Sequence, residues 1–206
     1  MASAASAVDV VIVDSGGANL ASLRFALDRL GARSRVSADP GVIAAAPRVL
    51  LPGVGAAPAA MARLRALSLI ETLGGLQQPL LGICLGMQLL YSHSAEGDTP
   101  CLGLLPGRVE PLTATPSRPV PHMGWNTCRV QQPDPLLRDI AASDYFYFVH
   151  GFAAPVGTAS SALTDYGQPF SAAVWHRNLH GVQFHPERSS HAGARVLRNF
   201  LALPCS

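Results

Sequence analysis

A cysteine bracketed by two glycines, directly after an apolar run, constrains this chain more than any other feature. Residues 79–83 are typical of a short buried strand, Cys84 follows it, and the next residues have the pattern of an amphipathic helix start. Gly82 and Gly86 leave little side chain to collide at a tight strand-to-helix turn. Sulfur at a helix N-terminus favours the thiolate, and the backbone N–H of Leu85 would point towards an oxyanion beside it. The segment therefore predicts that Cys84 is a nucleophile.

A second segment, His185-Pro186-Glu187, supplies a base and a carboxylate much later in the chain. We expect Pro186 to hold this stretch extended, which places the side chains of His185 and Glu187 on the same side. Cys84 would attack, His185 would move the proton, and Glu187 would orient the imidazole. An isolated cysteine is more often a small core residue, and an isolated His-x-Glu is more often a surface pair. The two segments together favour catalysis.

Alternation of strands and helices in the first half of the chain predicts an α/β fold. It favours three layers, with a mostly parallel central sheet covered by helices on both faces. The expected strands are 8–13, 33–36, 49–51 and 79–83, and the expected helices are 19–30 and 57–73.

The second half of the chain is expected to be rich in strands. Residues 103–132 carry many glycines and prolines between short β-like runs, which suggests hairpins. A closing amphipathic helix over 190–201 would turn Val196, Leu197 and Phe200 inward. Closely spaced strands are expected at 145–149, 159–164, 172–176 and 179–183.

Length and composition favour one domain over residues 8–203, with residues 1–7 as a flexible tail. Apolar residues make up 49% of the chain, charged residues 14%, and the net charge of +2 gives no argument for a nucleic acid or a membrane partner. No apolar run approaches the length of a membrane span. The cysteines lack paired metal-binding spacing, so we expect no metal and a reducing, cytoplasmic location. They are Cys84, Cys101, Cys128 and Cys205.

Two motifs resemble the signatures of the class I (triad) glutamine amidotransferases. They are Gly-Ile-Cys-Leu-Gly-Met-Gln at 82–88 and Gln-Phe-His-Pro-Glu at 183–187, and the resemblance covers nearly the whole chain. It implies the fold of that family and hydrolysis of the side-chain amide of glutamine. It also implies transfer of the ammonia to a synthase, without a metal or an organic cofactor.

The run Pro-Gly-Val-Gly at 52–55 leaves an expected strand and enters a loop. Sites in open α/β sheets lie at the carboxyl ends of strands, and Cys84 is expected at that edge too. On its own the run could be an ordinary strand-to-helix turn. The resemblance implies an oxyanion strand, in which Gly53 contacts substrate and the N–H of Val54 completes the oxyanion hole with Leu85.

Further substrate contacts are implied by the same resemblance. Gln88 lies one helical turn after Cys84, where it would contact bound glutamine, although a helix-face glutamine is the plainer interpretation. Glu96 would receive the α-ammonium group, with a solvated loop glutamate as the alternative. The backbone of Gly151 and Phe152 would hold the substrate carboxylate, although these residues replace two hydroxyl-bearing residues that are usual there.

His-Met-Gly-Trp-Asn at 122–126 resembles one branch of the family, the glutaminase subunit of imidazole glycerol phosphate synthase. The opening run 12–20 and Phe-Val-His at 148–150 agree, despite departures from the usual pattern at Ser15, Ala18 and Arg188. The branch implies a heterodimer with a cyclase subunit of (β/α)8-barrel fold, and products of histidine biosynthesis. The implied interface residues are Asn19, Met123, Trp125, Asn126 and Arg188. Trp125 could instead be a core anchor.

Three other functions stay open at this point. The chain could be the glutaminase of another pathway, such as pyridoxal phosphate, anthranilate or aminodeoxychorismate synthesis, although the run at 122–126 argues against it. It could be a catalytically silent scaffold that binds a partner, although the complete set of nucleophile, base and carboxylate argues against that. It could also be a cysteine peptidase or a γ-glutamyl hydrolase, which assays with short peptides and with glutamine would separate.

Overall fold

The computed structural model describes residues 9–16 and 20–205. The predictions for the tail at 1–7, for Ala18 and for Asn19 therefore lie outside the described residues. Within the described ranges, no helix is both long enough and apolar enough to cross a membrane.

One large mixed sheet of eight strands forms the centre of the described chain. The strands from β2 to β14 pair in parallel, and the remaining pairs are antiparallel. Strands β1 and β4 are apolar and buried along their whole length, as expected for parallel strands covered on both faces. The order is β2 (Ser34–Ser37), β1 (Val10–Val13), β3 (Val49–Gly53), β4 (Leu80–Cys84), β14 (Leu179–Val182), β13 (Pro169–His176), β12 (Ser160–Asp165) and β9 (Arg129–Val130).

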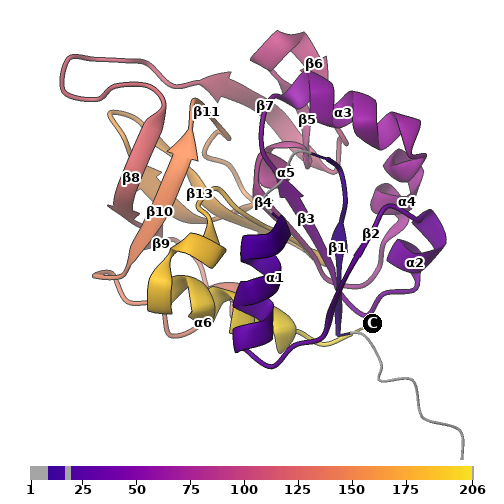
Figure 1. The fold of residues 1–206 in the computed structure, drawn as a ribbon. Helices are drawn as coiled ribbons and strands as arrows, with labels where there is room; N and C mark the ends of the chain where they lie inside the picture. The colour runs from indigo at the N-terminus through magenta and orange to yellow at the C-terminus, as the bar shows by residue number, and fades with distance from the viewer. Residues whose placement is uncertain (1–8, 17–19, 206) are drawn as a thin grey trace, which may run out of the picture.

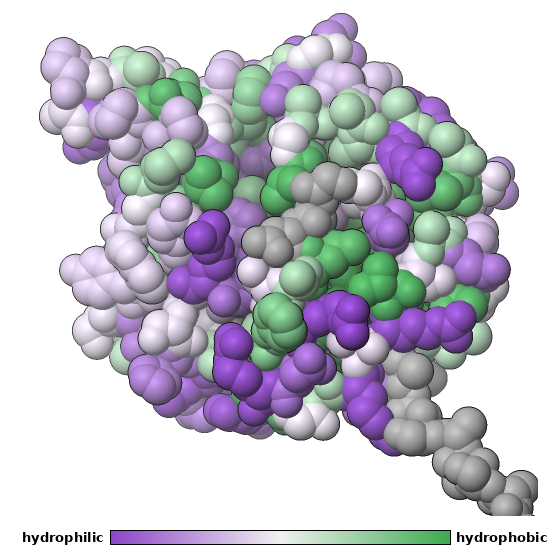
Figure 2. Space-filling model, in the orientation of Figure 1, coloured by the Kyte–Doolittle hydropathy of each residue, from purple (hydrophilic) through white to green (hydrophobic). Residues whose placement is uncertain are grey.

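Helices cover both faces of this sheet, so the predicted three-layer α/β architecture is confirmed (Figure 1). On one face, α1 (Leu20–Arg29) and α6 (Ser190–Leu201) pack in one apolar cluster. On the other face, a second cluster contains α2 (Pro40–Ala44), α3 (Ala57–Ala66) and α4 (Leu69–Gly75). The closing helix has its predicted bounds, and the inward positions predicted for it are fully buried. Hydrophilic and apolar side chains are interspersed on the face shown in Figure 2.

Two smaller sheets flank the central one, and their pairing differs from the predicted hairpins within 103–132. Strand β8 (His122–Thr127) pairs with β10 (Tyr145–His150), not with a sequence neighbour. Strand β7 (Leu105–Pro111) pairs with β5 and β11. The remaining strands of that four-stranded sheet are β11 (Phe152–Ala153), β5 (Tyr91–Ser94) and β6 (Thr99–Pro100).

Two predicted helices are wrong in length. The helix expected over 57–73 is divided into α3 and α4, because Ser68 between them adopts a left-handed φ of 56°. The helix after Cys84 is a single turn, α5 (Leu85–Gln88), and Tyr91 already begins β5. All residues of α5 are buried, so this turn is not amphipathic but lies inside the molecule.

Three one-turn 3-10 helices complete the described elements: η1 (Glu96–Asp98), η2 (Pro135–Leu137) and η3 (Pro186–Arg188). Strands β3, β4 and β14 are parallel neighbours, so their carboxyl ends meet at one edge of the sheet. The Pro-Gly-Val-Gly run, Cys84 and His185 come at or just after those ends. The fold therefore brings together segments that are far apart in the sequence.

Candidate active site

Cys84 occupies a strained turn between β4 and α5. Its φ is 54° and its ψ is −113°, a backbone conformation that a residue with a side chain rarely adopts. The neighbouring glycines are required by packing: a Cβ on Gly86 would collide with the carbonyl group of Leu51, and one on Gly82 would lie 2.7 Å from the oxygen of Gly86. The turn thus has the geometry that the sequence predicts for a nucleophile elbow.

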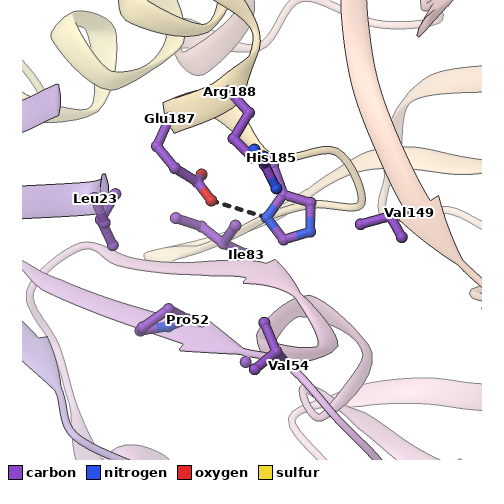
Figure 3. Close-up of a pocket in the computed structure, with 9 residues that line it drawn as sticks. Leu23, Pro52, Val54, Ile83, Val149, His185, Glu187 and Arg188 are labelled. Carbon is purple, nitrogen blue, oxygen red and sulfur yellow. Dashed lines mark hydrogen bonds and ion pairs between the residues drawn. The ribbon is translucent and has the colours of Figure 1, made fainter. Parts of the chain in front are cut away.

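His185 and Glu187 form a buried pair just beyond β14. Nδ1 of His185 lies 2.9 Å from Oε1 of Glu187, and the two side chains are 8% and 9% exposed (Figure 3). The backbone N–H of His185 also donates to the carbonyl of Tyr147 in β10 at 2.9 Å. The predicted extended stretch is wrong, because Pro186 begins η3. Proline suits the first position of such a turn, and the turn still brings the carboxylate to the imidazole.

Electrostatics favour a charged imidazole at this position. Burial alone would lower the pKa of His185, but interactions with Cys84 and Glu187 outweigh it and raise the pKa to about 10. Nε2 of His185 is buried, and none of the described residues forms a hydrogen bond with it. Since Nδ1 faces Glu187, Nε2 is the nitrogen that is free to exchange a proton.

A cavity of about 220 Å³ opens beside the sulfur of Cys84. Most of the residues predicted from the two motifs and the resemblance line it, although they come from distant parts of the sequence. A second cavity of about 110 Å³ adjoins His185 on the side of α1, and Gly53, Glu187 and Arg188 line it (Figure 3). The predicted residues that line the larger cavity are Val54, Cys84, Leu85, Gln88, Glu96, Gly151, Phe152 and His185.

Gln88 and Glu96 both make contacts that the sequence does not reveal. The side-chain nitrogen of Gln88 donates to the carbonyl of Phe152 at 2.8 Å and to Oε1 of Gln183 at 2.9 Å. Both of its N–H hydrogens are used, so only its Oε1 is free for a further partner. Oε2 of Glu96 accepts from the N–H of Ala57 at 2.7 Å, at the start of α3. Glu96 is half-buried and anchored, so it is not a freely solvated loop residue.

Met123 and Trp125 project from one face of β8, with 63% and 53% of their surface exposed. The alternative in which Trp125 is a core anchor is therefore wrong. Trp125 meets the ring of Tyr147 edge-on at 5.9 Å, and the guanidinium of Arg188 lies over the same ring. Asn126 does not share this face, because its amide donates to the carbonyl of Asp165 at 3.1 Å.

Sequence reasoning missed Tyr147 and Gln183. Tyr147 lies opposite Trp125 in the β10–β8 ladder, and the alternation of Tyr and Phe over 145–148 is the sequence signal that could have found it. Gln183 opens the second motif itself, but nothing in the motif says what its buried side chain contacts. Among the residues that the structure describes, no group of three His, Cys, Asp or Glu side chains could hold a metal ion.

Residues 11–203 match the family described as glutamine amidotransferase class-I. The chain belongs to this family. Among curated relatives, the HisH subunit of imidazole glycerol phosphate synthase from Xylella fastidiosa strain Temecula1 is 55% identical over 195 residues, 95% of this chain and 98% of the relative. The HisH subunit from Xanthomonas campestris strain 8004 is 54% identical over the same shares of the two chains. The chain is thus a member of the HisH branch, as the run at 122–126 predicts.

Solved structures agree on the fold. A putative GMP synthase subunit from Thermoplasma acidophilum superposes with a TM-score of 0.74 at 19% identity, covering 95% of this chain and 92% of that chain. The PurLQS structure from Thermotoga maritima gives a TM-score of 0.67 at 18% identity, covering 93% and 96% of the two chains. At these identities the likeness concerns the fold, which is the one predicted for class I amidotransferases.

Proposed function

We propose that this chain is the glutaminase subunit of imidazole glycerol phosphate synthase and hydrolyses glutamine to glutamate and ammonia. The observation that carries the proposal is the meeting of Cys84, at a strained turn, with the buried His185–Glu187 pair at the same edge of the sheet. Residues 8–203 would act as one amidotransferase domain, without a metal or an organic cofactor.

The first half of the reaction is acyl transfer to sulfur. Because the pKa of His185 is raised, the proton of the Cys84 thiol lies on Nε2 of His185, and the thiolate attacks the side-chain carboxamide carbon of glutamine. The carbonyl electron pair moves onto oxygen, where the backbone N–H groups of Leu85 and Val54 would stabilise the charge. His185 then gives its proton to the amide nitrogen, the C–N bond breaks, and ammonia leaves a γ-glutamyl thioester on the sulfur. The buried contact with Glu187 keeps the imidazole oriented through both proton transfers.

Water completes the cycle. His185 removes a proton from water as it attacks the thioester carbonyl, and the new oxyanion uses the same backbone donors. When the C–S bond breaks, glutamate departs and leaves the thiolate of Cys84 beside protonated His185. The sum is glutamine plus water giving glutamate plus ammonia, and the enzyme returns to its starting state.

The cavity supports a defined orientation for the substrate. Glu96 uses Oε2 on the backbone of α3 and keeps Oε1 for the α-ammonium group. The backbone at Gly151 and Phe152 would hold the α-carboxylate, and Gln88 offers its remaining acceptor, Oε1. Gly53, which lines the adjoining cavity, would contact the carboxamide end.

The partner in this proposal is a cyclase subunit with a (β/α)8-barrel fold, bound as a heterodimer in the cytoplasm. The exposed Met123 and Trp125, together with Arg188, would form part of the contact. Asn19 would join them, while Asn126 would act by holding the end of β8 to Asp165. The ammonia would pass to the cyclase, which makes imidazole glycerol phosphate and an aminoimidazole carboxamide ribotide.

Steady-state glutamine hydrolysis, measured with the cyclase and its ribonucleotide substrate present, tests the proposal. We expect glutamate and imidazole glycerol phosphate to form in equal amounts. A chain that hydrolyses short peptides but not glutamine, or that binds the cyclase without any hydrolysis, would contradict it.

A further inference from the structure

The side chain of Gln183 is fully buried next to the sulfur of Cys84, and the mechanism above gives it no role. Its Nε2 atom lies 3.7 Å from Sγ of Cys84, within the range of a hydrogen bond to sulfur. Gln183 follows β14 directly and precedes His185 by two residues, so the same backbone turn carries both side chains towards the sulfur.

The orientation of this amide is fixed by its neighbours. The nitrogen of Gln88 donates to the carbonyl of Phe152, and a carbonyl oxygen can only accept. The same nitrogen also faces the amide of Gln183 at 2.9 Å, so the atom of Gln183 at that contact must be the acceptor, Oε1. The NH₂ group of Gln183 is therefore the end that faces Cys84. The carbonyl of Phe152 therefore fixes which end of each amide is the nitrogen, first in Gln88 and then in Gln183.

Besides His185, whose imidazole interacts with Cys84, two polar groups of the described residues contact the sulfur, and they have opposite preferences. The carbonyl of Val149 lies 3.7 Å from Sγ and can accept a bond from the thiol, but it offers nothing to a thiolate. The NH₂ group of Gln183 is a donor, and a donor bonds a thiolate more strongly than a neutral thiol. When Cys84 loses its proton, its hydrogen bond to the carbonyl of Val149 would be lost and the one from the NH₂ group of Gln183 would become stronger.

We propose that Gln183 is a catalytic residue, which donates a hydrogen bond to the Cys84 sulfur and favours its thiolate, and that Gln88 is the positioning residue that aims this donor. The inference rests on the proposed function, because it assumes that Cys84 is the nucleophile. It gives Gln88 a role in the empty enzyme, in addition to any contact with substrate.

The test is the pH dependence of Cys84 alkylation by iodoacetamide, without substrate, read by mass spectrometry of the Cys84 peptide. Gln183→Met keeps the length of the side chain and removes the donor. We expect the midpoint of alkylation to move up by about one pH unit, which corresponds to a tenfold smaller thiolate fraction at a pH below both midpoints. Gln183→Glu should move it further, because a carboxylate in that place repels the thiolate. Gln88→Met should produce a smaller shift in the same direction, since Gln183 would remain but lose the hydrogen bond that orients its amide.

Gln78→Met provides the matched control. The amide of Gln78 donates to the carbonyls of Ile43 and Ala44, and it lies near the opposite end of β4 from Cys84. This substitution also removes a partly buried amide, so it should lower the melting temperature and leave the alkylation midpoint in place.

A folded Gln183→Met variant with the wild-type midpoint would overturn the inference. If Gln183→Met does not fold, Gln183→Glu provides the test, because its side chain has the same shape and keeps the acceptor for Gln88. A folded Gln183→Glu variant with the wild-type midpoint would also overturn the inference. The outcome is separate from that of the proposed function: a shifted midpoint in a chain that fails to hydrolyse glutamine would overturn the proposed function and leave the hydrogen bond to sulfur standing.

Discussion

The guanidinium of Arg188 lies over the ring of Tyr147, with its Cζ atom 5.2 Å from the ring centroid. Arg188 ends η3, the turn that carries Glu187, and Tyr147 belongs to β10. Trp125, on the exposed strand β8, meets the same ring edge-on. A surface proposed to bind a partner is therefore in direct contact with the turn that holds the carboxylate of the proposed catalytic pair.

Trp125→Ala should weaken assembly with the cyclase more than it harms folding. Truncation of an aromatic residue that becomes buried in an interface typically costs about 2 kcal/mol or more of binding free energy. Because 53% of Trp125 is exposed in the free chain, its removal should change the melting temperature little. Titration calorimetry with the cyclase and thermal melting of the free chain measure the two effects. Val130→Ala, at an exposed apolar residue of β9, is the control and should change neither.

Cys84→Ala should abolish glutamine hydrolysis while leaving the fold and cyclase binding intact. The substitution removes the sulfur and retains a Cβ at the strained turn, so the neighbouring contacts change little. Labelling by a glutamine-like electrophile should be lost together with the activity. Cys101→Ala, at a half-buried thiol outside the two cavities, should keep both. Residual glutamine hydrolysis by the Cys84→Ala variant would contradict the thioester mechanism.

Acid should destabilise the chain through its buried histidines. Burial lowers the pKa of His150 to about 3 and that of His180 to about 4, from an ordinary value of 6.5. Below pH 6.5 these histidines are protonated in the unfolded chain but stay neutral in the folded chain. The free energy of unfolding therefore decreases as the pH falls from 6.5 towards 4. Each such group contributes up to about 1.4 kcal/mol for each pH unit in that window.

Urea unfolding at pH 7, 6 and 5 measures this loss of stability. His180→Gln should reduce the slope of unfolding free energy against pH, whereas His176→Gln, at an exposed position, should leave it as it is. Equal slopes for the two variants would show that His180 is not the source.

Local patterns in the sequence predicted the elements that build the site, and the failures have identifiable causes. The strand before Cys84 and the helix Ser190–Leu201 follow from apolar runs and periodicity, which are local properties. The division of the helix expected over 57–73 does not follow from local patterns, since the apolar spacing continues past the left-handed turn at Ser68. Proline at 186 fits an extended chain and the first position of a 3-10 turn equally well, and tertiary contacts select the turn.

The sequence alone could not predict which distant strands pair. Nothing local says that β8 pairs with β10, and that ladder alone places Tyr147 opposite Trp125. The contact between Gln183 and Cys84 likewise depends on the parallel pairing of β4 with β14. The motifs and the family resemblance predicted most of the residues that line the larger cavity, but they gave neither the direction of the hydrogen bonds nor the residues that hold these side chains in place.

The isolated chain should hydrolyse glutamine slowly, and a cyclase that carries its ribonucleotide ligand should switch it on. Ammonia released into water is of no use to a synthase, so an oxyanion hole that is completed only in the assembled enzyme would avoid the loss. Gly53 and Gly55 flank Val54, whose N–H is proposed to complete that hole. Gly55 has a φ of +89°, and a Cβ at this position would have no atom of the described residues within 4 Å apart from its neighbours in the chain. These glycines permit the backbone rearrangement that such gating needs.

Loss of one oxyanion donor typically lowers the rate about a hundredfold to a thousandfold. We therefore expect the liganded cyclase to raise glutaminase activity by a factor of the same order. The measurement is steady-state glutaminase activity of the chain alone, with the cyclase, and with the cyclase plus its ligand. Gly55→Ala should reduce the activation, because a Cβ at a left-handed φ costs about 1–2 kcal/mol and limits the conformations of the loop. Full activity of the chain alone, unchanged by the partner, would remove gating and leave a hydrolase that is always active.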